Sequence, residues 1–194
     1  MFVIPALLAG VLGTANYITK DFIAEAQANK KKEAIEKVLP PFDRLEEEEK
    51  VAVETVVENN IFKKEQAADS LIMYDAYQND TWIGTAIETF TNKGFSGKIK
   101  LMVGFLPNGN IHKIEVLEHA ETPGLGDKME VEKGDKFPKQ FLGKNPASYK
   151  LSVSRDGGDV DAITAATISS RAYCDAVQTA YNVFIKKMEE KSNE

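Results

Sequence analysis

A segment of small and hydroxyl-bearing residues, residues 161–170, stands directly before a long amphipathic stretch. From Ala172 onward the apolar residues keep helical spacing, which predicts a helix with Ser169 or Ser170 as its N-cap. Thr167 is then expected at the mouth of this helix. Unpaired backbone N–H groups and the helix dipole favour negative charge there, so the segment can receive a phosphate. The alternative is that the hydroxyl groups only cap the helix.

A second short segment, residues 121–126, places Pro123 before Gly124. This order suits a type II turn, in which Gly124 takes a positive φ angle. Taken by itself, the segment reads as a surface turn.

The middle of the chain alternates strand-like segments with turn residues. Asn79-Asp80 and the Asn108-Gly109 step favour hairpin turns. A helix is predicted over residues 45–59 from the spacing of its valines, despite their β-branched side chains. Strands are predicted for residues 70–78, 81–90, 98–106, 111–117 and 149–154. Together with the C-terminal helix, these elements predict an α+β domain built on an antiparallel sheet.

The first 19 residues contain no charged side chain. As a helix they would extend ~28 Å, which is close to the hydrocarbon thickness of a bilayer. We expect a membrane anchor, followed by a helix over residues 21–39. The competing interpretation is a cleaved signal peptide, with Gly13-Thr14-Ala15 as a passable cleavage site but no basic residue before the apolar run.

Charge and residue usage exclude several classes of function. A formal net charge of −6 argues against nucleic acid as a partner. The single cysteine, Cys174, cannot form an intrachain disulfide and is expected to be buried on the last helix. The only histidines, His112 and His119, are expected on opposite sides of a strand, so no metal site is predicted. The sequence has no glycine-rich phosphate loop for a nucleotide.

The pattern Asp-x-x-Thr-x-Ala-Thr-x-Ser, formed by Asp161, Thr164, Ala166, Thr167 and Ser169, resembles the flavinylation motif of a known family. That family is the FMN-binding domain shared by the G subunit of Rnf-type electron transport complexes and the C subunit of sodium-pumping NADH:quinone reductases. Residues 121–126 resemble a loop that packs near the flavin in the same proteins. The resemblance also includes the N-terminal apolar segment and residues 35–40 and 94–97.

The resemblance implies one covalent FMN, joined to Thr167 through a phosphoester bond. The family usually has glycine where this chain has Ala165, so a left-handed backbone there would be strained. The implied cofactor-binding residues are Thr164, Ala165, Ala166, Thr167, Ile168 and Ser169 of the motif, with Glu121, Thr122, Leu125 and Gly126 of the loop. A separate Mg-dependent flavin transferase is expected to use FAD to modify Thr167. No catalytic residue and no metal ligand is expected on this chain.

The family also implies a domain organisation and a function. Residues 1–19 would be a single transmembrane helix in the cytoplasmic membrane, residues 20–60 a helical stalk and linker, and residues 61–194 an extracytoplasmic FMN-binding domain. The protein would relay electrons, with the other Rnf subunits as partners, in an ion-translocating ferredoxin:NAD oxidoreductase. Two alternatives stay open: the C subunit of a sodium-pumping quinone reductase, and an anchored FMN-binding module without a role in pumping.

Overall fold

The computed structural model describes residues 3–51, 71–133 and 136–192. The chain divides into two compact units, Met1–Glu33 and Ala34–Glu194. Helix α1, Val3–Val38, forms the first unit and contributes its last turns to the second. Residues 3–19 of the predicted anchor are helical. Within the described residues, no helix is both long enough and apolar enough to cross a membrane.

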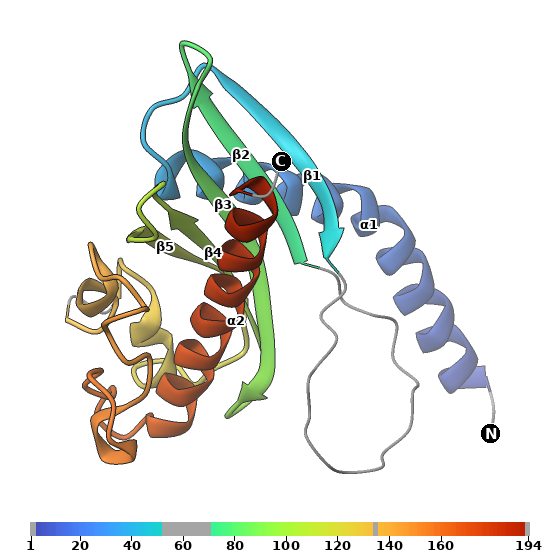
Figure 1. Cartoon of the computed structure of the whole chain (residues 1–194). Helices are drawn as coiled ribbons and strands as arrows, with labels where there is room; N and C mark the ends of the chain where they lie inside the picture. The colour runs from blue at the N-terminus through green and yellow to red at the C-terminus, as the bar shows by residue number, and fades with distance from the viewer. Residues whose placement is uncertain (1–2, 52–70, 134–135, 193–194) are drawn as a thin grey trace, which may run out of the picture. The chain divides into compact units, whose positions relative to one another are not determined.

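The second unit is built on a five-stranded antiparallel sheet whose strands follow one another in sequence order. Its strands are β1 (Arg44–Val51), β2 (Leu71–Gln78), β3 (Thr81–Gly94), β4 (Gly97–Phe105) and β5 (Ile111–His119). Three short 3-10 helices follow, η1 (Gly126–Met129), η2 (Pro138–Phe141) and η3 (Ser154–Asp156). The long helix α2, Thr167–Ser192, ends the fold. Figure 1 shows α2 running along one face of the sheet, with the yellow and orange segments gathered beside its first turns.

The hairpin predictions are confirmed. Asn79 and Asp80 both have positive φ angles, 48° and 58°, as a two-residue type I′ turn between β2 and β3 requires. Gly109 has a φ angle of 80° in the turn between β4 and β5. Four predicted strands are therefore present within a few residues of their expected bounds, because turn chemistry fixed where each of them ends.

The predicted helix over residues 45–59 is wrong in its described part. Arg44–Val51 is the edge strand β1, which pairs antiparallel with β2. The guanidinium of Arg44 lies 4.5 Å from the ring centroid of Tyr77 on β2. Charged side chains are common on edge strands because they discourage pairing with further chains. In residues 45–51 the pairing with β2 outweighs the local preference for a helix. Residues 52–59 lie outside the described residues.

The strand predicted over residues 149–154 is also wrong. The segment makes one isolated bridge, between Val153 and Val160, and then turns into η3. The N–H of Lys150 donates to the carboxylate of Asp159 at 2.7 Å, and the Tyr149 hydroxyl donates to the Asp159 carbonyl at 2.9 Å. These polar groups bond to the following loop, so no strand continues into the sheet.

Helix α2 and the sheet enclose the main hydrophobic core. Ile87 and Leu101 on the sheet and Val177 and Phe184 on α2 belong to one buried cluster. The rings of Phe105 and Phe184 stack with centroids 4.9 Å apart. Burial of this apolar surface holds α2 against β3 and β4, and it thereby fixes the position of the first turn of the helix.

The opposite face of the sheet packs against the end of α1. Ile35 and Val38 join Tyr74 and Met102 in a second buried cluster. Gly104 makes this approach possible, because a Cβ at that position would collide with the carbonyl oxygen of Val38. Residues 35–39 therefore fit the sheet closely.

Candidate functional site

A cavity of about 300 Å³ lies where three separate segments meet. The segments are the turn between β3 and β4, the loop after β5, and the first turn of α2 with the residues before it. Its lining residues are Phe95, Glu121, Thr122, Leu125, Gly126, Ala165, Ala166, Thr167, Ile168 and Ser169. Nine of the ten residues predicted from sequence thus lie around one cavity, although they come from two segments about 40 residues apart. Their contact with a flavin stays a prediction.

The predicted site residues and the residues that line the cavity differ at two positions. Phe95 was missed, although it lies within residues 94–97, where the sequence resemblance extends. A large aromatic residue between glycines was the available signal. Thr164 was predicted for the site, but it is exposed and not part of the wall. It precedes the residue that turns the chain toward α2.

Helix α2 begins earlier than predicted, at Thr167. Ser169 and Ser170 therefore lie in its first turn, and the prediction that one of them is the N-cap is wrong. The Ser170 hydroxyl instead accepts a hydrogen bond from the N–H of Ile163 and donates to the carbonyl of Ala166, both at 2.9 Å. Thr167 is half-buried and stands at the helix mouth, as predicted. The N–H of Ser170 donates to the carbonyl of Ala166 at 3.0 Å, whereas the N–H groups of Thr167, Ile168 and Ser169 have no carbonyl partner within the helix.

The chain enters α2 through a left-handed residue. Ala165 has a φ angle of 62°, so the backbone is left-handed at the position where the resembling family usually has glycine, and the strain considered for this position is present. A tight turn surrounds it, because the N–H of Ala166 donates to the carbonyl of Ile163 at 3.0 Å. The Ser170 hydroxyl closes the same turn from the helix side.

Two further contacts brace the motif from outside. The guanidinium of Arg171 donates to both carboxylate oxygens of Asp156, at 2.7 and 2.8 Å. These hydrogen bonds lower the pKa of Asp156 below its usual value. The N–H of Asp161 donates to the side-chain oxygen of Gln140 at 2.7 Å, and the Gln140 amide donates to the Asp161 carbonyl at 3.0 Å. Asp161 is not part of the cavity wall, but its hydrogen bonds to Gln140 help to position the loop before α2.

The loop after β5 turns where the sequence predicted. The N–H of Leu125 donates to the carbonyl of Thr122 at 3.1 Å, and Gly124 has a φ angle of 78°. This is the geometry of a type II turn and confirms the predicted positive φ. Gly126 is needed for a steric reason, since a Cβ there would lie 2.8 Å from Glu121 Oε2 and 2.9 Å from Ser169 Oγ.

The base of this loop is closed by His119. The N–H of Glu121 donates to His119 Nδ1 at 3.0 Å, so Nε2 carries the ring proton and donates to Glu130 at 2.7 Å. Lys133 adds an ion pair with Glu130 at 2.9 Å. Burial raises the pKa of Glu130, but the hydrogen bonds from Lys133 and His119 outweigh it, so the net pKa lies below the usual value. The two ends of the loop are thus held together.

The cavity mouth is apolar and its wall carries no basic side chain. Phe95, Leu125 and Ile168, one from each segment, are large apolar residues left exposed, and Phe95 is 66% exposed. None of the ten lining residues is lysine or arginine. An anionic ligand in this cavity would therefore rely on backbone N–H groups, hydroxyl groups or a covalent bond.

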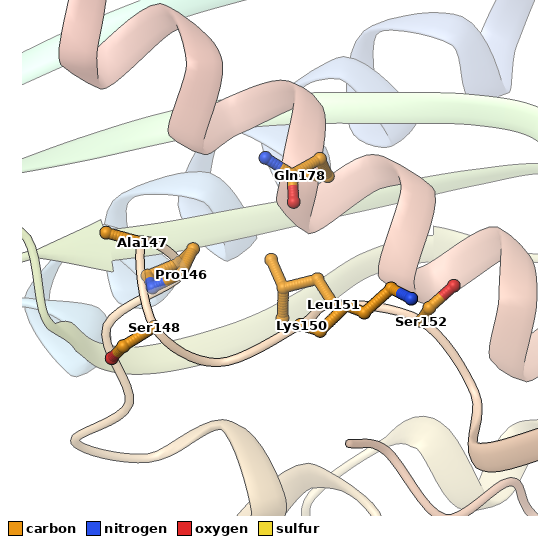
Figure 2. Close-up of a pocket in the computed structure, with 7 residues that line it drawn as sticks. All are labelled: Pro146, Ala147, Ser148, Lys150, Leu151, Ser152 and Gln178. Carbon is orange, nitrogen blue, oxygen red and sulfur yellow. The ribbon is translucent and has the colours of Figure 1, made fainter. Parts of the chain in front are cut away.

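A second hollow of about 410 Å³ lies between residues 146–152 and Gln178 of α2 (Figure 2). None of the predicted site residues lines it. Its one charged side chain, Lys150, donates to the carbonyl of Gly157 at 2.9 Å. The smaller cavity is the better candidate because the motif, the loop and the helix mouth meet there.

The cysteine and the two histidines do not line this cavity. Cys174 is buried, as predicted, and burial raises the pKa of its thiol to about 12. Nδ1 of His112 donates to the carbonyl of Val38 at 3.0 Å, whereas His119 closes the loop base. Within the described residues, no three histidine, cysteine or acidic side chains cluster to hold a metal ion.

The strained turn makes a testable prediction for Ala165→Gly. A residue with a Cβ in the left-handed conformation destabilises the folded protein by roughly 1–2 kcal/mol, and glycine removes this strain. Glycine also has more freedom in the unfolded chain, which offsets roughly 0.5–1 kcal/mol of that gain. We expect a net gain of about 0.5 kcal/mol in the free energy of unfolding, measured in urea. Ala147→Gly, at an exposed position without a positive φ, should lose stability. An equal loss at both positions would show that Ala165 is not strained.

Comparisons with known proteins identify the family of this chain. The model of the FMN-binding domain family matches residues 94–182. The relatives include the G subunit of the ion-translocating oxidoreductase complex of Erwinia tasmaniensis, 32% identical over 182 residues, covering 91% of this chain and 82% of the relative. The protein of the same name from Aliivibrio fischeri strain MJ11 is 35% identical over 179 residues, covering 90% and 83%. That from Escherichia coli K12 is 34% identical over 175 residues, covering 88% and 81%. The chain therefore belongs to the family of G subunits of ion-translocating oxidoreductase complexes.

Proposed function

We propose that this chain is the flavoprotein subunit that relays electrons through one covalently bound FMN in an Rnf-type ion-translocating oxidoreductase complex. One observation carries the proposal: the flavinylation-like motif and the second matching loop, distant in sequence, line a single cavity at the mouth of α2. The family assignment supports it, since the relatives are named as the G subunit of such a complex. Because these names specify the G subunit, the quinone reductase alternative is set aside.

In this proposal Thr167 carries the FMN phosphate. Its hydroxyl lies at the helix mouth, and the described residues offer it no hydrogen-bond partner. The N–H groups of the first turn of α2 and the helix dipole stabilise the phosphate charge. Ala165, Ala166 and Ile168 are sequence neighbours of the attachment point and line the same cavity.

The absence of a basic residue from the cavity wall fits covalent attachment better than simple binding. A phosphate held only by hydrogen bonds would leave the site as the free FMN concentration falls. Attachment forms a phosphoester at Thr167 Oγ1 and breaks the pyrophosphate bond of FAD. AMP leaves and the hydroxyl proton is released. Glu121 is the only carboxylate among the lining residues, and both of its oxygens already accept hydrogen bonds, so a separate flavin transferase supplies the catalysis.

The apolar residues at the mouth suit the isoalloxazine ring. Phe95, Leu125 and Ile168 offer apolar surface from three sides of the cavity. Bound flavin supplies reversible electron transfer, and the protein tunes it by contacts and nearby charge. Thr122 and Gly126 complete the wall on the loop side. The chain binds, orients and tunes the cofactor, while the other subunits react with ferredoxin and NAD.

The function is tested in the assembled complex. Membranes containing the complex should show bleaching of the covalent flavin absorption when reduced ferredoxin is added, and recovery when NAD⁺ is added. This chain should copurify with the other subunits. A fully labelled chain that copurifies with none of them, and whose flavin stays oxidised under these conditions, would favour an anchored flavin module outside electron transport.

The proposal includes a membrane topology. Residues 1–19 would anchor the chain in the cytoplasmic membrane, residues 20–60 would form a stalk and linker, and residues 61–194 would lie on the extracytoplasmic side. The support is the charge-free first 19 residues together with the family resemblance. A reporter that is active only outside the cytoplasm, fused after Glu194, should be active. If a cytoplasmic reporter fused at the same position is active instead, the proposed topology is wrong.

A further inference from the structure

Glu121 joins all three segments that form the cavity. The side chain is only 5% exposed, and both carboxylate oxygens accept hydrogen bonds. The N–H of Ser96, in the turn between β3 and β4, donates to Oε1 at 3.0 Å. The hydroxyl of Ser169, in the first turn of α2, donates to Oε2 at 2.5 Å. A single carboxylate on the third segment therefore holds the other two in place.

The surrounding backbone is shaped to admit this carboxylate. A Cβ at Gly94 would lie 2.7 Å from Glu121 Oε1, and a Cβ at Gly126 would lie 2.8 Å from Oε2. Glycine is therefore required on both sides of the same group. From behind, the N–H of Glu121 is bonded to His119, which closes the base of the loop. The position of the carboxylate is fixed at its backbone and at both oxygens.

The hydrogen bonds of Glu121 use both carboxylate oxygens as acceptors. A backbone N–H such as that of Ser96 can only donate, and the Ser169 hydroxyl donates to the other oxygen, so neither oxygen is needed as a donor. Ser169 places Oε2 against the first turn of α2, where the helix dipole stabilises negative charge. No lysine or arginine lines the cavity to neutralise the carboxylate.

We propose that Glu121 is a positioning residue that also sets the midpoint potential of the flavin: it fixes the three cavity walls and holds a negative charge beside the cofactor. This inference rests on the proposed function, because it requires FMN on Thr167. Reduction adds electrons to the flavin, so a fixed negative charge nearby disfavours the reduced form and lowers the potential. One side chain thus both holds the cavity walls in place and supplies the charge, and different substitutions can remove one role and keep the other.

The test compares two variants of the full-length protein, each labelled in cells that contain the transferase. Glu121→Gln keeps the shape and removes the charge: its amide oxygen can still accept from the Ser96 N–H, and its NH2 group can donate to the Ser169 hydroxyl once that hydroxyl turns to accept. We expect its melting temperature to stay near that of the wild type, and its ratio of reduced to oxidised flavin at a fixed ambient potential to rise about tenfold. That factor is what a unit charge produces over roughly 12 Å at an effective dielectric constant of about 20. Glu121→Asp keeps the charge but is too short to reach both donors, so it should melt earlier while its potential stays near that of the wild type.

Glu118→Gln is the matched control, since it removes one negative charge from an exposed position three residues away. Its potential should equal that of the wild type in a spectroelectrochemical titration.

The inference is overturned by an unchanged potential in labelled Glu121→Gln, or by a potential in Glu121→Asp that rises well above the wild type. It is also overturned if Glu121→Gln folds but takes no flavin, because the residue would then act in attachment. If Glu121→Gln does not fold, Glu121→Ala removes the same charge, and an unchanged potential in that labelled variant overturns the inference. An absence of flavin from the wild type and the control would instead contradict the proposed function.

Discussion

We expect Thr167→Ala to carry no covalent flavin, whereas the wild type, produced with the flavin transferase, is fully labelled. Alanine removes the only hydroxyl oxygen to which the phosphate can be joined in this proposal, so the loss should be complete. The cavity wall should otherwise remain, because the structure gives the Thr167 side chain no hydrogen-bond partner among the described residues. In-gel fluorescence after denaturation measures the label directly.

Thr122→Ala is the matched control for this loss. Thr122 is a second threonine in the wall of the same cavity, and it lies on the loop side, away from the helix mouth. Its substitution should leave the label in place. A fluorescent band in Thr167→Ala, or an equal loss in Thr122→Ala, would show that attachment does not depend specifically on Thr167.

The second large effect is expected at Asp75, in the core between the sheet and α2. Asp75 is fully buried on β2 and accepts hydrogen bonds from Thr85 at 2.5 Å, Lys187 at 2.5 Å and Lys191 at 3.1 Å. Asp75→Asn removes the buried counter-charge of Lys187, whose side chain is only 5% exposed. Loss of one partner from a buried ion pair costs about 3–5 kcal/mol, so we expect a fall of that size in the free energy of unfolding in urea.

The stability that Asp75 contributes should fall when the pH is lowered. Burial raises the pKa of Asp75, but the hydrogen bonds from Lys187 and Thr85 outweigh it, so the net pKa lies below the ordinary 3.8. A carboxyl with a lowered pKa in the folded state stabilises the protein above its ordinary pKa and loses that contribution as the pH falls through the folded value. The difference between wild type and Asp75→Asn should therefore shrink below pH 3.8.

Asp156→Asn serves as the control for Asp75→Asn. Asp156 also pairs with a basic residue, Arg171, but both side chains are exposed, Arg171 to 49% and Asp156 to 38%. Exposed ion pairs contribute little to stability, so this substitution should have a much smaller effect. Equal losses at the two positions would contradict the assignment of Asp75 as a buried structural ion pair.

The sequence predicted the elements whose ends are marked by turn chemistry. Asn79 and Asp80 accept positive φ angles, and Gly109 does the same in the next turn, so both hairpins were predictable from local residues. Strand β1 was not, because the acidic run at residues 46–49 carries no strand signal of its own. Its structure comes from pairing with β2, which lies beyond residues 52–70, and no local pattern reveals such a partner.

For the candidate site, the family motif predicted most of the wall but not what holds it together. The motif placed Thr167 at the helix mouth and drew attention to Ala165, where the family usually has glycine. It could not reveal that Glu121 bonds to Ser96 and Ser169, because these partners are 25 and 48 residues away in sequence. The same limit applies to Ser170, which was predicted as a cap because serine often caps helices. In the structure its hydroxyl bonds to the turn before the helix.

The central claim, one FMN joined covalently to Thr167, is tested most directly by intact mass and peptide mapping of the wild-type protein. The protein should come from cells that contain the flavin transferase. We predict a mass increase of one FMN less one water, retained after denaturation. Cleavage after Arg155 and Arg171 releases a peptide of residues 156–171, and fragmentation should locate the added mass on Thr167. An unmodified mass, or a flavin located on another residue, would contradict the claim.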